Sequence, residues 1–322
     1  MTRRLAAFGA ALLLSMGLLA GCGGGPAAPD QGAQPGTQEP AGNPAGSRET
    51  VYPLTITDDS GRQVTIPAEP KRVVSVAPSN TEIVFAIGKG DVLVGRSEFD
   101  EYPPEALEID SIGGYAPPNY ELILSKEPDL VLVIGGSGEA TNKLINEYGL
   151  TVVVIDSESF SDVYDAIRLI GQILNAQEKA EQVASEMEQR VNEIAAKAAQ
   201  AETRPKVFYE VWDDPLMTAG RGTFIDELIR LAGGENVGAA VEGWSGFSME
   251  QVVAADPDII MAGSYFDTAG IAARPGWSEI KAMKEGKVYP VEDPDLVTLP
   301  GPRLVQGLEW MARTIHPEIF SE

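Results

Sequence analysis

Short apolar runs alternate with helical patterns along this chain, and this alternation restricts the possible folds more than any other feature. The strand-like runs are 72–76, 92–94, 130–134 and 152–155, followed after a long helical stretch by 207–209, 259–262 and 288–291. Strands that alternate with helices indicate a parallel, doubly wound α/β sheet. Because the alternation restarts, the 322-residue chain is predicted to hold two α/β lobes.

A long amphipathic helix is predicted between these two halves. From Ala176 to about Gln200, apolar residues recur every three or four positions without an intervening Gly or Pro. About 25 helical residues would span about 38 Å, which suits either a surface helix or a bridge between lobes. The expected organisation is a first lobe over 51–175, a helix over 176–203 and a second lobe over 204–322.

The two halves also share a weak internal repeat. Glu121–Leu132 matches Glu250–Met261 without a gap, and in each copy a short helix is expected to end at Pro-Asp before a buried strand. This match favours an ancient duplication. A β-hairpin around Asp58–Gly61 is expected to precede the first lobe's sheet, because apolar residues alternate on both sides of that turn.

The first 50 residues are predicted to be a targeting signal and a tether rather than part of the fold. Arg3 and Arg4 precede an uncharged apolar run, which indicates an export signal over 1–22. That run is about 17 residues long, at the lower limit for a membrane span, so a retained transmembrane helix is the alternative. The sequence Leu19–Cys22 resembles the bacterial lipobox, whose cysteine is acylated. Residues 23–50 are rich in Gly and Pro and are predicted to be a disordered tether.

These features predict an extracytoplasmic protein anchored to the cell membrane by lipid on Cys22, and the composition narrows its function further. The formal charge of −24 makes nucleic acid a poor partner. One cysteine excludes an intramolecular disulfide and a multi-thiolate metal site. A single histidine, His316, excludes multi-histidine zinc sites and disfavours a Ser-His-Asp hydrolase. The chain is predicted not to be an enzyme, with no metal or cofactor of its own and with a structural role for His316.

Several stretches together resemble one family. They are Arg72–Gly88, Asp100–Ala106, Gly113–Ile123 and Glu127–Val133, and in the second half Gly233–Asn236 and Ser248–Val253. Their order and spacing resemble those of the periplasmic binding proteins for cobalamin, ferric siderophores and heme that serve ABC importers, with the cobalamin proteins nearest. The resemblance covers about residues 51–318. It implies two Rossmann-like lobes bridged by one long α-helix, a ligand cleft between the lobes, a small closing motion and a monomer.

The resemblance also implies how the protein meets its importer. In this family one glutamate on each lobe docks into arginine-lined pockets of the permease transmembrane subunits, and the matching positions are Glu121 and Glu250. They are equivalent members of the internal repeat. Carboxylate–guanidinium pairing is bidentate and therefore orients the two bodies. The alternative is a pair of solvated glutamates favoured by the helix dipole.

Aromatic residues at expected loop tips are the first candidates for ligand contacts. Phe99, Tyr115 and Trp244 match aromatic positions of the resembled cobalamin proteins. Trp212 follows a strand and should lie at its C-terminal end, where open α/β sheets bind ligands. Aromatic walls suit a large flat macrocycle. Ordinary core packing is the alternative for each.

Two aspartates after the last strand are the polar candidates. Asp295 matches, without gaps, an aspartate that binds corrin amides in the family, although nearby insertions could make Asp293 the counterpart. A carboxylate accepts hydrogen bonds from amides. Turn capping is an equal alternative. The glycines of Gly135–Gly138 lack the spacing and lysine of a phosphate loop and predict a plain turn.

The ligand class stays open at this point, with a metal chelate expected and a corrinoid favoured. Cations facing the cleft, for which Arg96, Arg221 and Arg303 are candidates, would favour an anionic ferric siderophore instead. Heme would need an axial ligand, for which Tyr115 or Tyr209 could serve. An exported enzyme on the same scaffold and a lipoprotein without ligand are the other classes.

Overall fold

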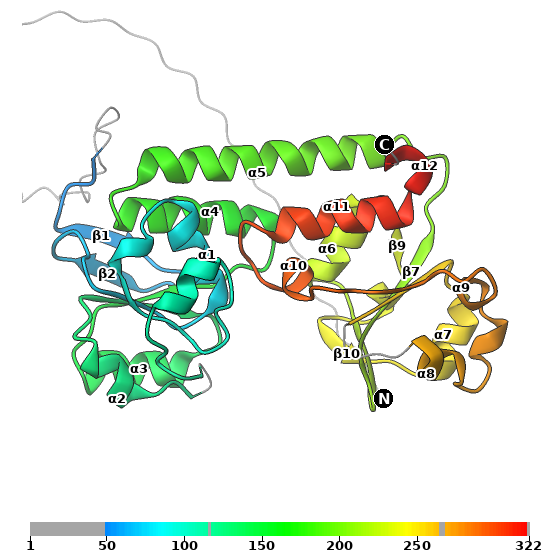
Figure 1. The fold of residues 1–322 in the computed structure, drawn as a ribbon, viewed down its shortest axis with the longest axis horizontal. Helices are drawn as coiled ribbons and strands as arrows, with labels where there is room; N and C mark the ends of the chain where they lie inside the picture. The colour runs from blue at the N-terminus through cyan, green and yellow to red at the C-terminus, as the bar shows by residue number, and fades with distance from the viewer. Residues whose placement is uncertain (1–48, 115–116, 264–267, 321–322) are drawn as a thin grey trace, which may run out of the picture. The chain divides into compact units, whose positions relative to one another are not determined.

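The structure, a computed structural model, describes residues 49–114, 117–263 and 268–320 (Figure 1). All of them lie within one unit of the chain. The expected export signal, the lipidation at Cys22 and the tether up to residue 48 fall outside the described residues. Thr50, predicted as the last residue of a disordered tether, is instead buried, because its amide donates to Oδ1 of Asn175 at 2.8 Å and its hydroxyl donates to the main-chain oxygen of Gln172 at 2.6 Å. Among the residues described, none of the helices is both long and apolar enough to cross a membrane.

The first lobe is built on a four-stranded parallel sheet with the order β4-β3-β5-β6. Its strands read as continuous apolar runs because helices cover both faces of the sheet. The strands are β3 (Val73–Ser75), β4 (Leu93–Gly95), β5 (Leu130–Ile134) and β6 (Val152–Ile155). The helices are α1 (Pro78–Ala86), α2 (Tyr120–Ser125), α3 (Gly138–Asn146) and α4 (Phe160–Ile173), with 3₁₀ turns at Gly90–Val92 and Pro104–Glu108.

The predicted hairpin forms a separate antiparallel sheet from β1 (Leu54–Thr57) and β2 (Gln63–Ile66). Its turn is held by the buried carboxylate of Asp58, which accepts hydrogen bonds from the Ser60 hydroxyl at 2.6 Å and from the Val154 amide at 3.2 Å. Burial alone would raise the pKa of Asp58, but hydrogen bonds from Ser60, Arg62 and Val154 lower it. One side chain thus fastens the hairpin to β6.

The second lobe is built on a mixed sheet with the order β10-β8-β7-β11-β12, and β9 pairs with β7 outside this path. The strands are β7 (Lys206–Asp213), β8 (Leu216–Ala219), β9 (Glu235–Asn236), β10 (Trp244–Gly246), β11 (Ile259–Ala262) and β12 (Val288–Pro290). The helices are α6 (Phe224–Leu231), α7 (Met249–Ala255), α8 (Thr268–Ala272), α9 (Lys281–Lys284), α10 (Asp295–Thr298), α11 (Leu304–Ile315) and α12 (Pro317–Phe320), with 3₁₀ turns at Val237–Ala240 and Trp277–Glu279.

Strands β7, β11 and β12 are parallel, as the apolar runs predict, and their register places Ala262 beside both Glu210 and Pro290. Strands β8 and β10 are antiparallel additions that the sequence pattern did not predict. Both are short, and polar residues interrupt them: β8 contains Thr218 although it is mostly buried, and β10 is largely exposed, so neither has the continuous apolar run of the other strands. The α/β class is confirmed, and the second sheet is mixed rather than wholly parallel.

The internal repeat has the same geometry in both lobes. In each, the residue before the proline has a left-handed φ of 47°, and a short helix (α2 or α7) leads into a central strand (β5 or β11). The aspartate after the proline accepts a hydrogen bond from a main-chain N–H at the start of the first strand in the main sheet of its lobe, just before β3 in the first lobe and at the first residue of β7 in the second. Asp129 accepts from Arg72 at 3.1 Å, and Asp258 accepts from Lys206 at 2.8 Å. These matching turns support the duplication.

Helix α5 (Gln177–Ala198) lies within the predicted helical segment and packs against both lobes. Its buried face contains Met187, Val191 and Ile194, and Val183 is half-buried. It contacts α4 of the first lobe and also α6 and α11 of the second. Figure 1 shows α5 running along one side of both lobes.

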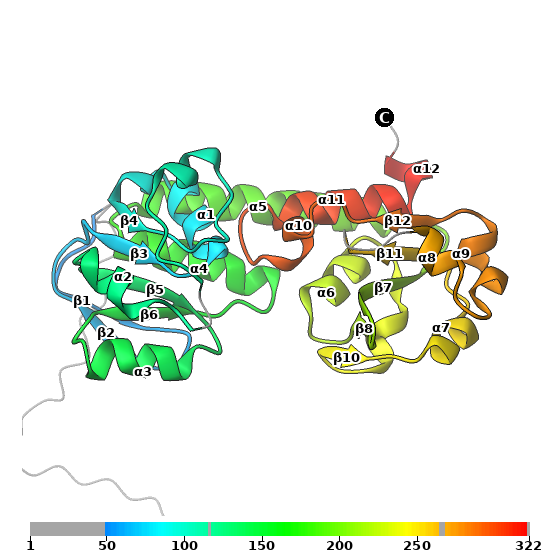
Figure 2. The same ribbon diagram turned by 60° about the horizontal axis from the view of Figure 1, so that its bottom comes forward.

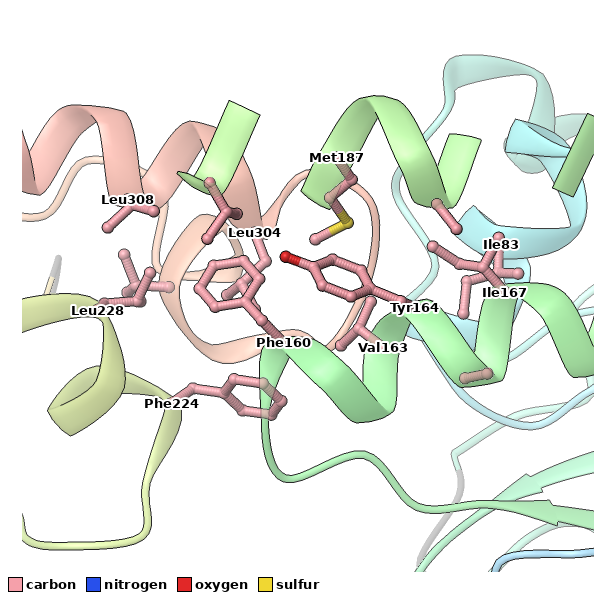
Figure 3. Packing of buried hydrophobic residues seen from close by; sticks show 14 of the residues in the cluster. Ile83, Phe160, Val163, Tyr164, Ile167, Met187, Phe224, Leu228, Leu304 and Leu308 are labelled. Atoms are coloured by element: carbon pink, nitrogen blue, oxygen red, sulfur yellow. The ribbon is translucent and has the colours of Figure 1, made fainter. Parts of the chain in front are cut away.

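A single apolar core passes from one lobe to the other beneath α5. Figure 3 shows Phe160 of α4 lying among Phe224 and Leu228 of α6 and Leu304 of α11. Met187 of α5 covers the neighbouring part of α4. The lobes are therefore joined by side-chain packing as well as by the helix that connects them.

Shortening a residue of this shared core should destabilise both lobes together. Leu304 is fully buried, so Leu304→Ala should lower the free energy of unfolding by about 2–5 kcal/mol. Chemical denaturation should still show one transition, since both lobes share the core. The exposed Gln306→Ala on the same helix is the control and should change little. Two separate transitions would contradict a shared core.

Candidate ligand-binding site

A pocket of about 260 Å³ lies between the lobes. Its lining from the first lobe consists of Ala77, Pro78, Ser79, Phe99 and Ile134, and from the second lobe Asp295 and Leu299. Two of the residues predicted to contact ligand, Phe99 and Asp295, therefore meet in one pocket although they come from different lobes. Figure 2 shows α10, which begins at Asp295, on the side of the second lobe that faces α1.

The pocket lies where the parallel strands end. Residues 77–79 connect β3 to α1, Ile134 is the last residue of β5, and Asp295 follows β12. The carboxyl ends of parallel strands are the usual ligand sites of open α/β sheets. The start of α1 has no side-chain cap, and the positive end of the helix dipole lies at the pocket wall.

Phe99 is presented by a turn with a buried polar centre. The Asp100 carboxylate accepts hydrogen bonds from the hydroxyls of Ser97, at 2.6 Å, and Thr81. The Ser97 oxygen in turn accepts from the Phe99 amide at 3.1 Å. Burial raises the pKa of Asp100, and these hydroxyl donors oppose the rise. The turn is thus fixed from within while the Phe99 side chain stays 51 % exposed.

The two candidate aspartates have different roles in the structure. Asp293 caps the turn before α10, where its Oδ1 accepts from the Asp295 amide at 3.1 Å, and its Oδ2 lies 3.3 Å from Nη1 of Arg303. Asp293 also borders a separate pocket of about 150 Å³. Asp295 lines the interlobe pocket, and burial together with the charge of Asp293 raises its pKa. Asp295 is therefore the better candidate for a ligand contact.

The two candidate tryptophans share one exposed face of the second sheet. Trp212 pairs with Met217 on β8, and Trp244 pairs with Ala219 two residues further along that strand. Residues directly opposite in a ladder point to the same side, as do positions i and i+2. The side chains are 49 % and 48 % exposed, and the Trp212 indole N–H donates to the main-chain oxygen of Asp214 at 3.0 Å.

Trp212 lies at the same end of the second sheet as Asp295, namely the end where β7, β11 and β12 have their carboxyl termini. On β7, Trp212 lies two residues beyond Glu210, which is level with Pro290, the last residue of β12. Only β11 separates these strands, so their ends are about 10 Å apart. Neither tryptophan belongs to the 260 Å³ pocket itself. Tyr115 lies outside the described residues.

The two predicted docking glutamates occupy equivalent exposed positions. Glu121 lies in the first turn of α2, which Asn119 caps, and Glu250 lies in the first turn of α7, which begins with a capping box from Ser248 and Gln251. Hydrogen bonds from the main chain and from Ser248 lower the pKa of Glu250. In Figure 1 both helices lie on the side of their lobes away from α5.

The arginines that could have favoured an anionic ligand all have partners. Arg96 donates to two main-chain oxygens within the first lobe, at 2.8 and 2.7 Å. Arg221 pairs with Glu242 at 2.7 Å and borders a surface pocket confined to the second lobe. Arg303 does lie between the lobes, but it pairs with Glu82. No positively charged side chain lines the interlobe pocket among the residues that the structure describes.

A fourth arginine near the ends of the second lobe's strands is also neutralised. Arg274 binds the fully buried carboxylate of Glu210 through both of its terminal nitrogens, at 2.5 and 2.7 Å. Its guanidinium stacks on Trp277 at 4.6 Å from the ring centroid. This pair belongs to the interior of the lobe.

Tyr209 cannot serve as the axial ligand of a heme, in contrast to one interpretation of the sequence. Its side chain is buried in the core, and burial raises its pKa. His316 is buried between Glu318, at 3.0 Å, and the main-chain oxygen of Gly233, at 3.3 Å, which suits the expected structural role. No group of potential metal ligands is found across the described ranges.

Sequence reasoning missed several residues of the site. The helix start after β3 could have indicated Ser79, because such starts border ligand sites in α/β folds. No local signal identifies Leu299 or Glu82. The pairing of Glu82 with Arg303 joins residues 221 positions apart.

Comparison with known proteins identifies the family of the chain. A model of the periplasmic binding protein family matches residues 73–294. The chain is 38 % identical to the uncharacterized ABC transporter substrate-binding lipoprotein YvrC of Bacillus subtilis, over 99 % of this chain and 100 % of that protein. It is 31 % identical to the cobalamin-binding protein of Halobacterium salinarum, over 87 % of this chain and 78 % of that protein.

Among solved structures, the periplasmic vitamin B12 binding protein BtuF of Vibrio cholerae matches with a TM-score of 0.70 and 27 % identity, covering 78 % of this chain and 98 % of that one. The relatives are binding proteins, not enzymes. The chain therefore belongs to the periplasmic binding protein family, as an extracytoplasmic substrate-binding protein of an ABC transporter.

Proposed function

We propose that this protein captures a corrinoid, cobalamin or a close relative, between its lobes and delivers it to an ABC importer. The observation that carries the proposal is the meeting of Phe99 and Asp295 from opposite lobes in one pocket. The named functions of two relatives, which bind cobalamin and vitamin B12, support the same ligand class.

The chemistry of the pocket suits the rim of a corrin ring. Phe99 offers an aromatic face, and Asp295 offers a carboxylate acceptor for the N–H groups of peripheral amides. The exposed Trp212 and Trp244 add aromatic surface on the second lobe. The pocket alone is smaller than the volumes typical of drug-sized ligand sites, so it would hold one edge of the ligand while the tryptophans cover more of it.

Charge favours a corrinoid over an anionic ferric chelate. Within the part of the chain that the structure describes, the interlobe pocket is lined by one ionisable side chain, the carboxylate of Asp295. The nearby Arg303 is paired with Glu82 and Asp293. A ligand with several negative charges would meet uncompensated repulsion there, whereas amide donors would not.

The ligand assignment is tested by calorimetric titration with cyanocobalamin, heme and a panel of ferric siderophores. Cyanocobalamin should bind, and Phe99→Ala and Asp295→Ala should each raise its Kd about 10-fold or more because each removes a direct contact. Leu107→Ala, at an exposed apolar residue of the same lobe, is the matched control and should leave the Kd unchanged. Tight binding of a ferric siderophore or of heme, without binding of cyanocobalamin, would contradict the assignment.

We further propose that Glu121 and Glu250 are the contacts with arginine-lined pockets of the permease. Their support is geometric, because each is exposed in the first turn of equivalent helices on the two lobes. A carboxylate at a helix start keeps its charge and pairs well with a guanidinium. One copy of the chain provides both contacts, so we propose that it acts as a monomer.

The double variant Glu121→Ala/Glu250→Ala should abolish uptake of radiolabelled cobalamin in cells, because both anchors to the permease are lost. Its Kd for cyanocobalamin should stay unchanged, since neither residue lines the pocket. Glu139→Ala/Glu186→Ala, at two other exposed glutamates, is the control and should transport normally. A weaker Kd in the docking variant would show that the assignment is wrong.

We also propose that an export signal over 1–22 is removed and that lipid on Cys22 anchors the protein outside the cytoplasmic membrane. The lipobox-like Leu19–Cys22 and the naming of the relative YvrC as a lipoprotein support this anchor. Cys22→Ser should move the protein from the membrane fraction to a soluble extracytoplasmic fraction, as followed by immunoblotting. Unchanged membrane association would contradict a lipid anchor at that cysteine.

A further inference from the structure

A cluster of charged side chains joins the two lobes beside the pocket. Arg303, just before α11, donates from Nε to Oε1 of Glu82 on α1 at 2.8 Å, and its Nη2 lies 2.5 Å from the same oxygen. Its Nη1 lies 3.3 Å from Oδ2 of Asp293. The guanidinium also lies over the ring of Tyr102, 4.1 Å from the centroid.

The Glu82–Arg303 pair of this cluster is shielded from water, unlike a surface ion pair. The side chain of Glu82 is 3 % exposed and that of Arg303 is 14 % exposed. Burial raises the pKa of Glu82, and the guanidinium opposes that rise. The chain passes so close that a side chain at Gly301 would lie 3.0 Å from Oε2 of Glu82. Removing one partner would leave the other charge buried and unpaired, which is strongly unfavourable.

The position of Arg303 links both walls of the pocket. Asp293 and Arg303 stand at the two ends of the segment that carries Asp295 and Leu299, which form the wall from the second lobe. Glu82 belongs to α1, whose first turn forms the facing wall. A single guanidinium therefore holds the ends of one wall together and ties them to the other.

We infer that Arg303, through Glu82 and Asp293, is a positioning residue that sets the width of the interlobe pocket and the direction of Asp295. The inference deepens the proposed function and rests on it for the identity of the ligand. A pocket held at fixed width avoids the entropic cost of ordering two walls when a rigid ligand binds. It also discriminates by shape, because the walls cannot readily move apart for a bulkier ligand.

The test uses the double variant Glu82→Gln/Arg303→Met in the otherwise full chain. Replacing both partners removes the pair without leaving a buried charge alone, so the fold is retained. Arg303→Lys keeps the charge but lacks the planar fork that reaches two carboxylates at once. Arg221→Met/Glu242→Gln, which removes an exposed pair within the second lobe, is the matched control.

Two measurements are made on each variant. The first is the Kd for cyanocobalamin by calorimetry, together with the Tm. The second is the distance distribution between spin labels at Glu121→Cys and Glu250→Cys, recorded without ligand in a Cys22→Ser background. The labels report on the lobes whatever the ligand is, so this measurement stands even if the protein binds no corrinoid and the proposed function fails.

The double variant should keep a Tm close to that of the parent chain, bind cyanocobalamin about 10-fold or more weakly, and show a broader distance distribution. Arg303→Lys should fall between the parent and the double variant. The control pair should match the parent in both measurements. An unchanged Kd for a bound corrinoid, or an unchanged distance distribution, in the double variant would overturn the inference.

Discussion

The apolar core that the two lobes share is the interaction on which the rest of the structure depends. Phe160 of α4 packs against α6 and α11 of the second lobe, and Met187 of α5 covers the junction. The chain segments at the pocket continue directly into this core, because Leu304 follows the turn that carries Arg303. The geometry of the interlobe pocket is thus set by the packing of buried side chains. Burial of apolar surface stabilises the contact between the lobes. The charged cluster beside the pocket sets how the two pocket walls are oriented.

Duplication explains why the molecule offers the same chemistry twice. Each lobe uses a helix, a Pro-Asp turn and a central strand, and the aspartate fastens that turn to the first strand of its own lobe. The exposed glutamates Glu121 and Glu250 occupy the same place in each copy. The copies differ where ligand contacts are expected, since the second sheet alone carries the antiparallel strands that present Trp212 and Trp244. If the glutamates contact the permease and the tryptophans contact the ligand as proposed, the repeated part would fit a repeated partner surface and the divergent part an asymmetric ligand.

The sequence predicted the buried strands well and the polar connections poorly. The runs 130–134, 152–155 and 259–262 match their strands residue for residue, because a strand covered on both faces must be apolar throughout. Strands β8 and β10 escaped prediction because they are short and because Thr218 and Ser245 interrupt their apolar residues. Resemblance to a family indicated Phe99 and Asp295, which both line the interlobe pocket, but it left Asp293 and Asp295 as alternatives, and the pairing of Asp293 with Arg303 is seen only in the structure. The pairing of Glu82 with Arg303 depends on the assembled lobes and has no local sequence signal.

The placement of α2 and α7 on the side of the lobes away from α5 has a consequence for signalling. Because α5 spans both lobes on one side, a tilt of one lobe against the other displaces groups near α5 least. Groups on the opposite side are displaced most. If Glu121 and Glu250 contact the permease as proposed, the distance between these two carboxylates reports the relative position of the two lobes. Even the small tilt that the shared core and the Arg303 cluster permit would then give loaded and empty molecules different spans between these carboxylates, and the membrane subunits could distinguish the two without contacting the ligand.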